Sequence, residues 1–342
     1  MKRTTLLMTK ISTAALLAFA FSGCGFEDVM QKQKVQDNLS EASRQLSLGN
    51  LTSARAWTDR AIHADPGYAG AYVTVPDTSS MTGNDDMVEG SATIYGVYVA
   101  GGDYADAVSY LKQGAKEFPN EYRILTALLD CEQIVGDSAG EQQTANQLVS
   151  VLNARIAKGN VDGDVLTALG TAYLTLGNRT KALATYQKAM SIYVTDWGVY
   201  NNSAYELAVV NSKQDLPQAL NNATIALGQA QKQGGDDEEG NVAEIRDTIG
   251  WIEYRMGKYS QAAYDINQAL ETIPDEPESH YHLGMIYLAE GERSAAKSEF
   301  TKAILIAPAY ADAKAALAQV KNAPPIPDVA TNDITDPNTP VQ

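Results

Sequence analysis

The sequence predicts an all-α repeat protein, and three observations support this prediction. A period of 34 residues recurs along most of the 342-residue chain. Within each period, small and aromatic residues return at the same offsets, and glycine or proline stands where a helix would have to end. A fixed period of this length is typical of solenoids, in which stacked units share one continuous core because a single unit cannot bury its apolar face alone.

The unit at residues 277–310 shows the pattern most clearly. Small residues at Gly284 and Ala296 let two helix backbones approach, while Phe300 fills the gap between them. Gly291 is placed to end the first helix in the left-handed conformation, which glycine adopts without steric cost. The same offsets return one period earlier, in residues 243–276, as Ile249-Gly250, Gly257, Ala262, Ala269 and Pro274.

The pattern Leu-Gly-x-x-Tyr, followed by Ala, an aromatic residue, Ala and Pro, resembles the tetratricopeptide repeat family. The resemblance implies a right-handed α-solenoid of about seven helix-turn-helix units over residues 35–322. A polar segment at 76–86 interrupts one unit, and Asn241 is predicted to cap the helix that follows an acidic turn. The expected units are 35–68, 69–87 (interrupted), 88–121, 122–155, 163–196, 197–233, 243–276 and 277–310, with a capping helix at 311–321.

The N-terminal residues are typical of a secreted protein. Lys2, Arg3 and Lys10 precede an apolar run over residues 11–21 that is too short to span a membrane, which predicts a signal peptide over residues 1–23. Its removal takes away three positive charges and no negative ones, so the net charge moves from −16 to −19. Such a surface repels nucleic acid, whose binding requires a basic face.

The run Phe21-Ser22-Gly23-Cys24 resembles a bacterial lipobox. This resemblance implies cleavage before Cys24 and attachment of lipid to it, with residues 24–34 as a short lipidated tether. Gly25 resembles the residue found in cargo of the outer membrane, so the implied location is the bacterial cell envelope, on an outer membrane facing the periplasm. The alternative is a plain secreted protein in which Cys24 occurs by chance.

The C-terminal segment, residues 323–342, contains five prolines and no Lys or Arg, and we expect it to be disordered. The other cysteine of the chain is Cys131, so lipidation of Cys24 would leave no pair for an internal disulfide. The stability of the folded chain is therefore expected to come from packing.

One motif suggests catalysis. The run Gly136-Asp137-Ser138-Ala139-Gly140 matches the G-x-S-x-G nucleophile elbow, but it follows a predicted helix where the elbow requires a strand. His280 and His282 lie two residues apart, on different helix faces, which does not suit a metal site. The sequence therefore predicts no catalytic residue, no metal site and no cofactor, with an esterase using Ser138 as a distant alternative.

The resemblance also implies where a partner would bind, because the first helix of each unit in this family lines a concave groove. Positions two, five, nine and twelve of the units face into it. We expect an extended or helical segment with aromatic or basic anchors to pack on Tyr205, Trp251 and Tyr254. The other interpretation is that Trp251 is buried against the neighbouring unit. The predicted groove residues are Asn201, Tyr205, Asp247, Trp251, Tyr254, Tyr281 and Met285.

These features together predict a lipid-anchored, non-enzymatic scaffold that binds envelope proteins through the groove and the membrane through its lipid. Similar lipoproteins assemble pili, secretion systems or polysaccharide-export systems. A lipoprotein that binds a glycan or peptide ligand is the alternative, since Tyr and Trp stack on sugar rings.

Overall fold

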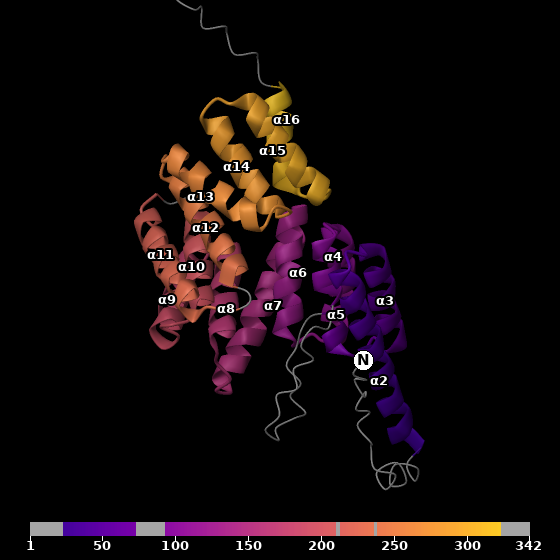
Figure 1. Ribbon diagram of the computed structural model, residues 1–342. Coiled ribbons are helices and arrows are strands. Elements are labelled where there is room, and N and C mark those ends of the chain that lie inside the picture. Colours follow the sequence, from indigo (N-terminus) through magenta and orange to yellow (C-terminus); the bar gives the residue numbers. More distant parts are fainter. Residues whose placement is uncertain (1–22, 73–92, 210–212, 236–237, 323–342) are drawn as a thin grey trace, which may run out of the picture.

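The computed structural model describes residues 23–72, 93–209, 213–235 and 238–322. Within these ranges the chain is helical and contains no strand. Consecutive helices pack as antiparallel hairpins that stack along the chain (Figure 1), which confirms the predicted α-solenoid. Residues 1–22 of the predicted signal peptide, the segment at 76–86 and the tail at 323–342 lie outside the described residues.

The described helices form seven hairpins and a final capping helix, α16 (Ala311–Asn322). The first helices of the hairpins are α2 (Gly23–Ser47), α4 (Ile94–Ala100), α6 (Tyr122–Val135), α8 (Gly163–Thr175), α10 (Trp197–Val209), α12 (Glu238–Arg255) and α14 (Pro277–Ala289). The second helices are α3 (Leu51–Ala64), α5 (Tyr104–Glu117), α7 (Ser138–Ala157), α9 (Arg179–Ile192), α11 (Leu216–Gln233), α13 (Tyr259–Thr272) and α15 (Arg293–Ile306).

One first helix is split. A short 3-10 helix, η1 (Ala69–Ala71), leads to Tyr72, whose carbonyl oxygen accepts a hydrogen bond from the backbone N–H of Tyr95 at 3.1 Å. This bond joins Tyr72 to the first turn of α4, and both segments pack in one buried cluster. Among the described residues of the spans expected as two units, 69–87 and 88–121, the structure shows one helix hairpin, α4 with α5, preceded by η1.

Two helix starts differ from the sequence-based expectation. Helix α2 begins at Gly23, so residues 24–34, expected as a tether, are its first turns. Helix α12 begins at Glu238, so Asn241 lies inside the helix and does not cap it. In both places the helix begins several residues before the first position of the repeat unit. The repeat pattern locates the contacts inside a unit, but it does not determine where the first helix begins.

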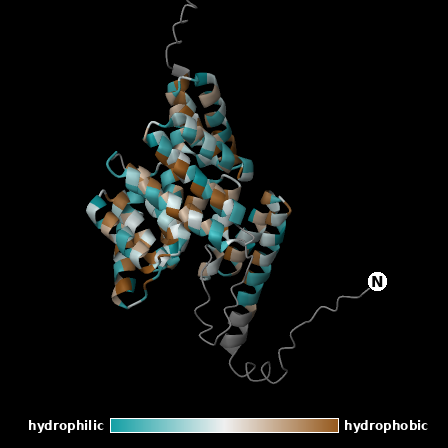
Figure 2. Ribbon diagram, turned by 60° about the vertical axis from the view of Figure 1, so that its left-hand side comes forward, coloured by the Kyte–Doolittle hydropathy of each residue, from teal (hydrophilic) through white to brown (hydrophobic). Residues whose placement is uncertain are grey.

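The small residues of the repeat lie where the two helices of a hairpin cross. A Cβ atom added to Gly284 would lie 2.5 Å from the Phe300 ring, so only glycine fits against this aromatic residue. Gly291 ends the hairpin's first helix with a φ of 85°, as predicted. In Figure 2, hydrophobic residues recur among hydrophilic ones along the helices, as expected when one face of each helix packs on its neighbours.

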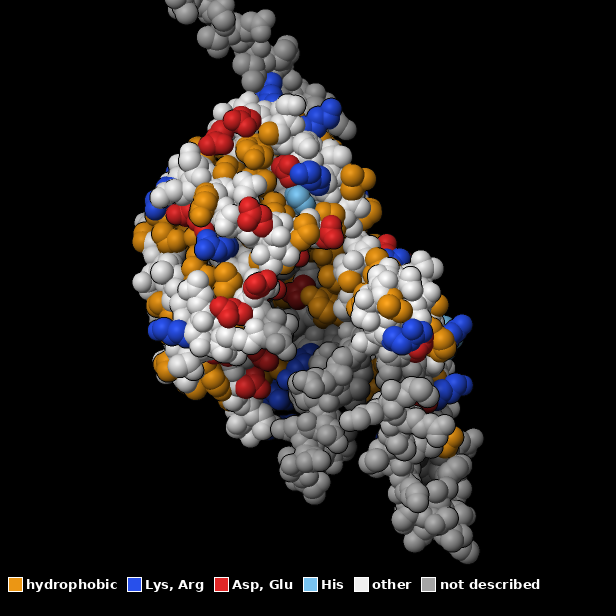
Figure 3. Space-filling view, in the orientation of Figure 1, with side chains coloured by type: hydrophobic (Ala, Val, Ile, Leu, Met, Phe, Trp, Pro, Cys, Tyr) orange, Lys and Arg blue, Asp and Glu red, His pale blue; other side chains and the backbone are white. Residues whose placement is uncertain are grey.

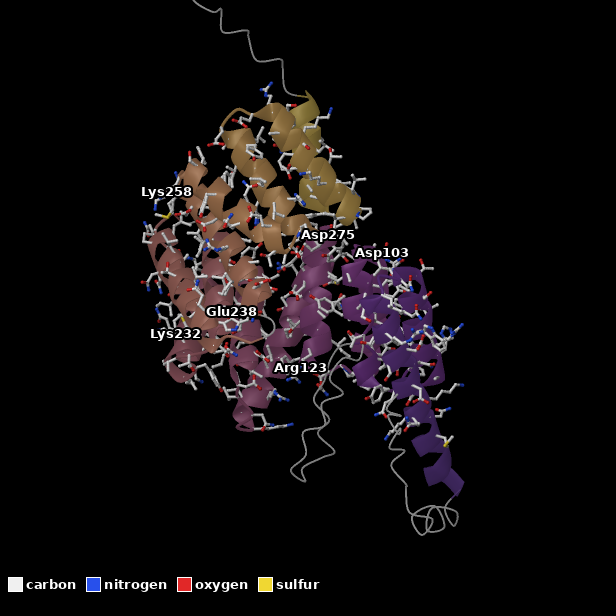
Figure 4. All side chains as sticks on the ribbon, in the orientation of Figure 1. Asp103, Arg123, Lys232, Glu238, Lys258 and Asp275 are labelled. Atoms are coloured by element: carbon white, nitrogen blue, oxygen red, sulfur yellow. The ribbon has the colours of Figure 1, made fainter. Side chains whose placement is uncertain are left out.

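The array curls until its two ends meet. Ala303, Ala307 and Tyr310, at the end of α15 and just beyond it, belong to the same buried cluster as Tyr98 and Ile124 of α4 and α6. Figure 1 shows α14–α16 at the top of α4 and α6, and Figure 4 labels Asp103 and Asp275, from the turns before α5 and α14, at this junction. We call this contact the closing contact, and it turns the first helices toward one enclosed inner face.

Candidate functional site

The inner face contains a hollow lined by acidic and tyrosine side chains. Figure 3 shows it between the C-terminal half of the molecule and the N-terminal hairpins, with red carboxylates on its walls. The side chains concerned lie close enough to shift one another's pKa, although they come from four helices and the turn before α14. We define the inner hollow by Tyr95, Asp130, Tyr205, Glu206, Glu276, Glu278 and Tyr281.

The predicted groove residues come together beside the inner hollow. Tyr205, Trp251, Tyr254, Tyr281 and Met285 belong to one apolar cluster on α10, α12 and α14. On each of these helices, spacings of three or four residues bring the side chains onto one face. The remaining two, Asn201 and Asp247, precede Tyr205 and Trp251 by one turn on the same faces.

Trp251 is a core residue in this structure. It is 8% exposed, stacks on the His282 ring at 4.2 Å between centroids, and stacks on Tyr254 at 4.9 Å. Trp251 is therefore buried against the neighbouring hairpin, as the second interpretation of the sequence expected. This residue does not offer an open aromatic surface to a partner. The accessible aromatic surface is provided by the half-buried rings of Tyr205, Tyr254 and Tyr281.

A buried ion-pair network lies under these rings. His282 is 1% exposed, and its Nδ1 lies 2.9 Å from Oδ2 of Asp247. Burial disfavours the imidazolium, but the carboxylates of Asp247 and Glu278 outweigh that effect and raise the pKa of His282. The hydroxyl of Tyr205 donates a hydrogen bond to Glu278, which ties α10 to α14. These contacts link α10 and α12 to α14 and so hold the inner faces of the three helices in place.

The carboxyl groups of the inner hollow have raised pKa values. Burial, followed by neighbouring carboxylates, raises the pKa of Asp130, Glu206 and Glu276 to about 7, and the pKa of Glu278 is raised mainly by burial. Each side chain keeps partial contact with solvent although protein surrounds it on most sides. The hollow therefore crowds carboxyl groups, which are partly protonated near pH 7, into a site that water reaches.

The structure places the histidine and serine residues that the sequence analysis weighed for metal binding and catalysis. In the ranges that the structure describes, no group of three or more His, Cys, Asp or Glu side chains is arranged to hold a metal ion. Ser138 is exposed at the start of α7 and follows helix α6, where a nucleophile elbow requires a strand. Asp137 accepts a hydrogen bond from the Gly140 N–H at 3.0 Å, so the motif serves as a helix cap.

Several lining residues were not predicted, and the repeat register contained part of the signal. Asp130 occupies position nine of the unit at Tyr122, and Glu278 occupies position two of the unit at Pro277. Both positions face the groove in the resembled family, so the same rule would have found them. Tyr95 carries no such signal, because the insertion after Tyr72 displaces its register.

A chain of stacked helix hairpins, with glycines where paired helices approach closely, as at Gly170, Gly250 and Gly284, is a helical repeat protein. A family model described as a tetratricopeptide repeat matches residues 253–320, and a second model with this description matches residues 163–193. The chain therefore contains tetratricopeptide repeats, which the two models match over these segments. This fold is that of a scaffold for protein–protein interaction.

Similar solved structures share the helical repeat but not a close sequence. A tetratricopeptide repeat protein from Parabacteroides merdae is 14% identical, with a TM-score of 0.49 over 85% of this chain and 100% of that one. The Cut9–Hcn1 hetero-tetramer of APC/C (18%, TM-score 0.42) and yeast Tom70 (14%, TM-score 0.44) each match 79% of this chain. The match covers about half of the length of each of those two chains, 52% for Cut9–Hcn1 and 51% for Tom70. No curated protein matches it.

Within the described ranges, no helix combines the length and the apolar character that crossing a bilayer requires.

Proposed function

We propose that this chain is a lipid-anchored, non-enzymatic scaffold of the bacterial cell envelope that holds a segment of a partner protein in its inner hollow. One observation carries the proposal: the first helices of a tetratricopeptide repeat array turn a set of half-buried tyrosines and carboxylates toward one accessible hollow. Tyrosine is enriched at the energetic centres of protein interfaces, because it buries a large rigid surface and keeps a polar group.

The predicted signal peptide and the lipobox-like run ending at Cys24 support the envelope location. A lipid on Cys24 would place α2, the first helix of the array, directly beside the membrane. In this arrangement the scaffold assembles a pilus, secretion or polysaccharide-export system at the periplasmic face of an outer membrane.

Site-specific photocrosslinking in the host cell tests the proposal. We expect a photoreactive amino acid in place of Tyr281, in the inner hollow, to capture a discrete partner protein. The matched control is the same amino acid in place of Tyr264, which is 62% exposed on α13. Equal capture at both positions would contradict binding in the hollow, and capture of no protein at position 281 would direct the search to glycan ligands.

The anchor requires a separate test. We expect the mature chain to incorporate a radiolabelled fatty acid and to fractionate with membranes, and Cys24→Ser to abolish both. Membrane association that persists in Cys24→Ser without label would refute the lipid anchor and leave binding in the hollow untouched.

A further inference from the structure

We infer that the partner segment held in the inner hollow carries Lys or Arg side chains, which enter among its carboxylates. The inference rests on the proposed function and specifies the chemistry of the partner. It follows from three independent features of the inner hollow and of the groove residues beside it: crowded carboxylates, buried acceptor atoms without donors, and tyrosine rings.

The first feature is uncompensated negative charge. Asp130 on α6, Glu206 on α10 and the pair Glu276 and Glu278 at the start of α14 act on one another through space. The neighbouring charges that raise their pKa are carboxylates, and the cationic group that acts on Glu278 is His282, which already pairs with Asp247. Like charges held together in a partly desolvated site repel one another, and a cationic guest removes that repulsion.

The second feature is a pair of buried oxygen atoms that lack a donor. Asp247 and Asn201 are each 8% exposed, and Oδ1 of each side chain has no hydrogen-bond partner. Asp247 adds its charge to those that shift Glu276 and Glu278, and Asn201 lies one turn before Tyr205 on the inner side of α10. Both orphan atoms are acceptors, so the groups that satisfy them are donors. Ammonium and guanidinium groups offer three and five N–H donors and no acceptor.

The third feature is the aromatic wall. The Tyr281 ring lies 5.8 Å from His282 and 5.4 Å from Tyr310, and Tyr205 and Tyr281 both remain half-buried. Tyrosine faces attract cations within about 6 Å of the ring centroid and also pack on the aliphatic stems of Lys and Arg. The described carboxylates do not converge as metal ligands, so the matching guest is an organic cation with an aliphatic stem.

Peptide binding to the full chain, solubilised in detergent, tests the inference. The probes are short fluorescent peptides in which Lys and Arg alternate with Ser, compared with the same peptides carrying Gln in place of Lys and Arg. We expect binding of the cationic peptides, measured by anisotropy, to weaken about tenfold in the double variant Asp130→Asn, Glu206→Gln, which corresponds to about 1.4 kcal/mol. The matched control, Glu271→Gln with Glu290→Gln, removes two carboxyl groups from exposed positions and is expected to keep the original affinity. Binding is measured at pH 8, where the carboxyl groups of Asp130 and Glu206 are mostly ionised.

Circular dichroism of both double variants confirms that they remain folded. Equal binding of the cationic and Gln peptides would overturn the inference, and so would equal weakening by the inner and outer variants, since general attraction to an acidic surface would then suffice. Full competition by free spermidine at the peptide's own concentration would overturn the requirement for a protein segment. If crosslinking at position 281 captures a partner while cationic peptides fail to bind, the scaffold function stands and this inference alone is wrong.

Discussion

The closing contact can be tested with a single methyl group. Gly102 lies in the turn between α4 and α5 with a φ of 71°, and a Cβ atom there would overlap the carbonyl oxygen of Ile306 at the end of α15. Gly177 provides the matched control, because its φ is also 71° and a Cβ there would meet no atom within 4 Å. Gly102→Ala and Gly177→Ala therefore impose the same backbone strain, and only the first disturbs the contact between the ends of the array.

The structure sets the size of the difference. A left-handed conformation costs an alanine about 1–2 kcal/mol, which both variants share. At Gly102 the obstructing atom belongs to the backbone, so α15 must move, and overpacking of this kind costs about 1–3 kcal/mol more. We expect the free energy of unfolding to fall by about 2–5 kcal/mol in Gly102→Ala and by about 1–2 kcal/mol in Gly177→Ala.

Urea denaturation followed by circular dichroism measures these changes, and hydrogen exchange locates them. In Gly102→Ala we expect faster amide exchange in both α4 and α16, because each loses its partner across the closing contact. In Gly177→Ala the exchange of α4 and α16 is expected to stay unchanged. Equal destabilisation by the two substitutions, with α16 equally protected in both, would refute the contact between the two ends.

Three further outcomes follow from burial and charge. The raised pKa values of Asp130 and Glu206 mean that the folded chain holds more protons than the unfolded chain between about pH 4 and 7, so these groups make stability fall as pH rises through that window. Thermal unfolding at pH 5 and pH 8 is expected to show a smaller decrease in Asp130→Asn, Glu206→Gln than in the natural chain, and an unchanged difference would contradict the assignment. Phe300→Ala is expected to cost about 3–5 kcal/mol, against about 0.5 kcal/mol or less for the exposed Tyr264→Ala, both measured by urea denaturation. In a variant that keeps Trp251 as its single tryptophan, acrylamide is expected to quench fluorescence far less than it quenches free indole, and quenching like that of free indole would place Trp251 in the open.

The hairpin repeat was predictable from sequence because its positions obey local rules. Gly284 opposite Phe300 and the left-handed Gly291 depend on contacts within about one period, so the period itself carries the information. The same holds for Asp130 and Glu278, which the register places on the inner face. Residue spacing therefore predicts helix crossings, helix ends and the helix face on which a side chain lies.

The closing contact and the burial of Trp251 could not be predicted in this way. The contact uses Ala303, which also satisfies the small-residue pattern inside its own unit and so carries no second signal. Whether Trp251 is open or covered depends on where His282 of the next hairpin lies, and the register fixes the face of a residue but not what covers it. The closing contact depends on how all the intervening hairpins are stacked, whereas the burial of Trp251 depends on the side-chain packing of one neighbouring hairpin.

Tyr72 and Tyr95 lie side by side in the structure although they are far apart in the sequence. The backbone N–H of Tyr95 donates a hydrogen bond to the carbonyl oxygen of Tyr72, so the two described ends of the chain on either side of residues 73–92 are held together. The entropic cost of closing such an excursion grows only slowly with its length. A reporter or a second binding element inserted between Tyr72 and Tyr95 would therefore add little to the entropic cost of bringing these two residues together.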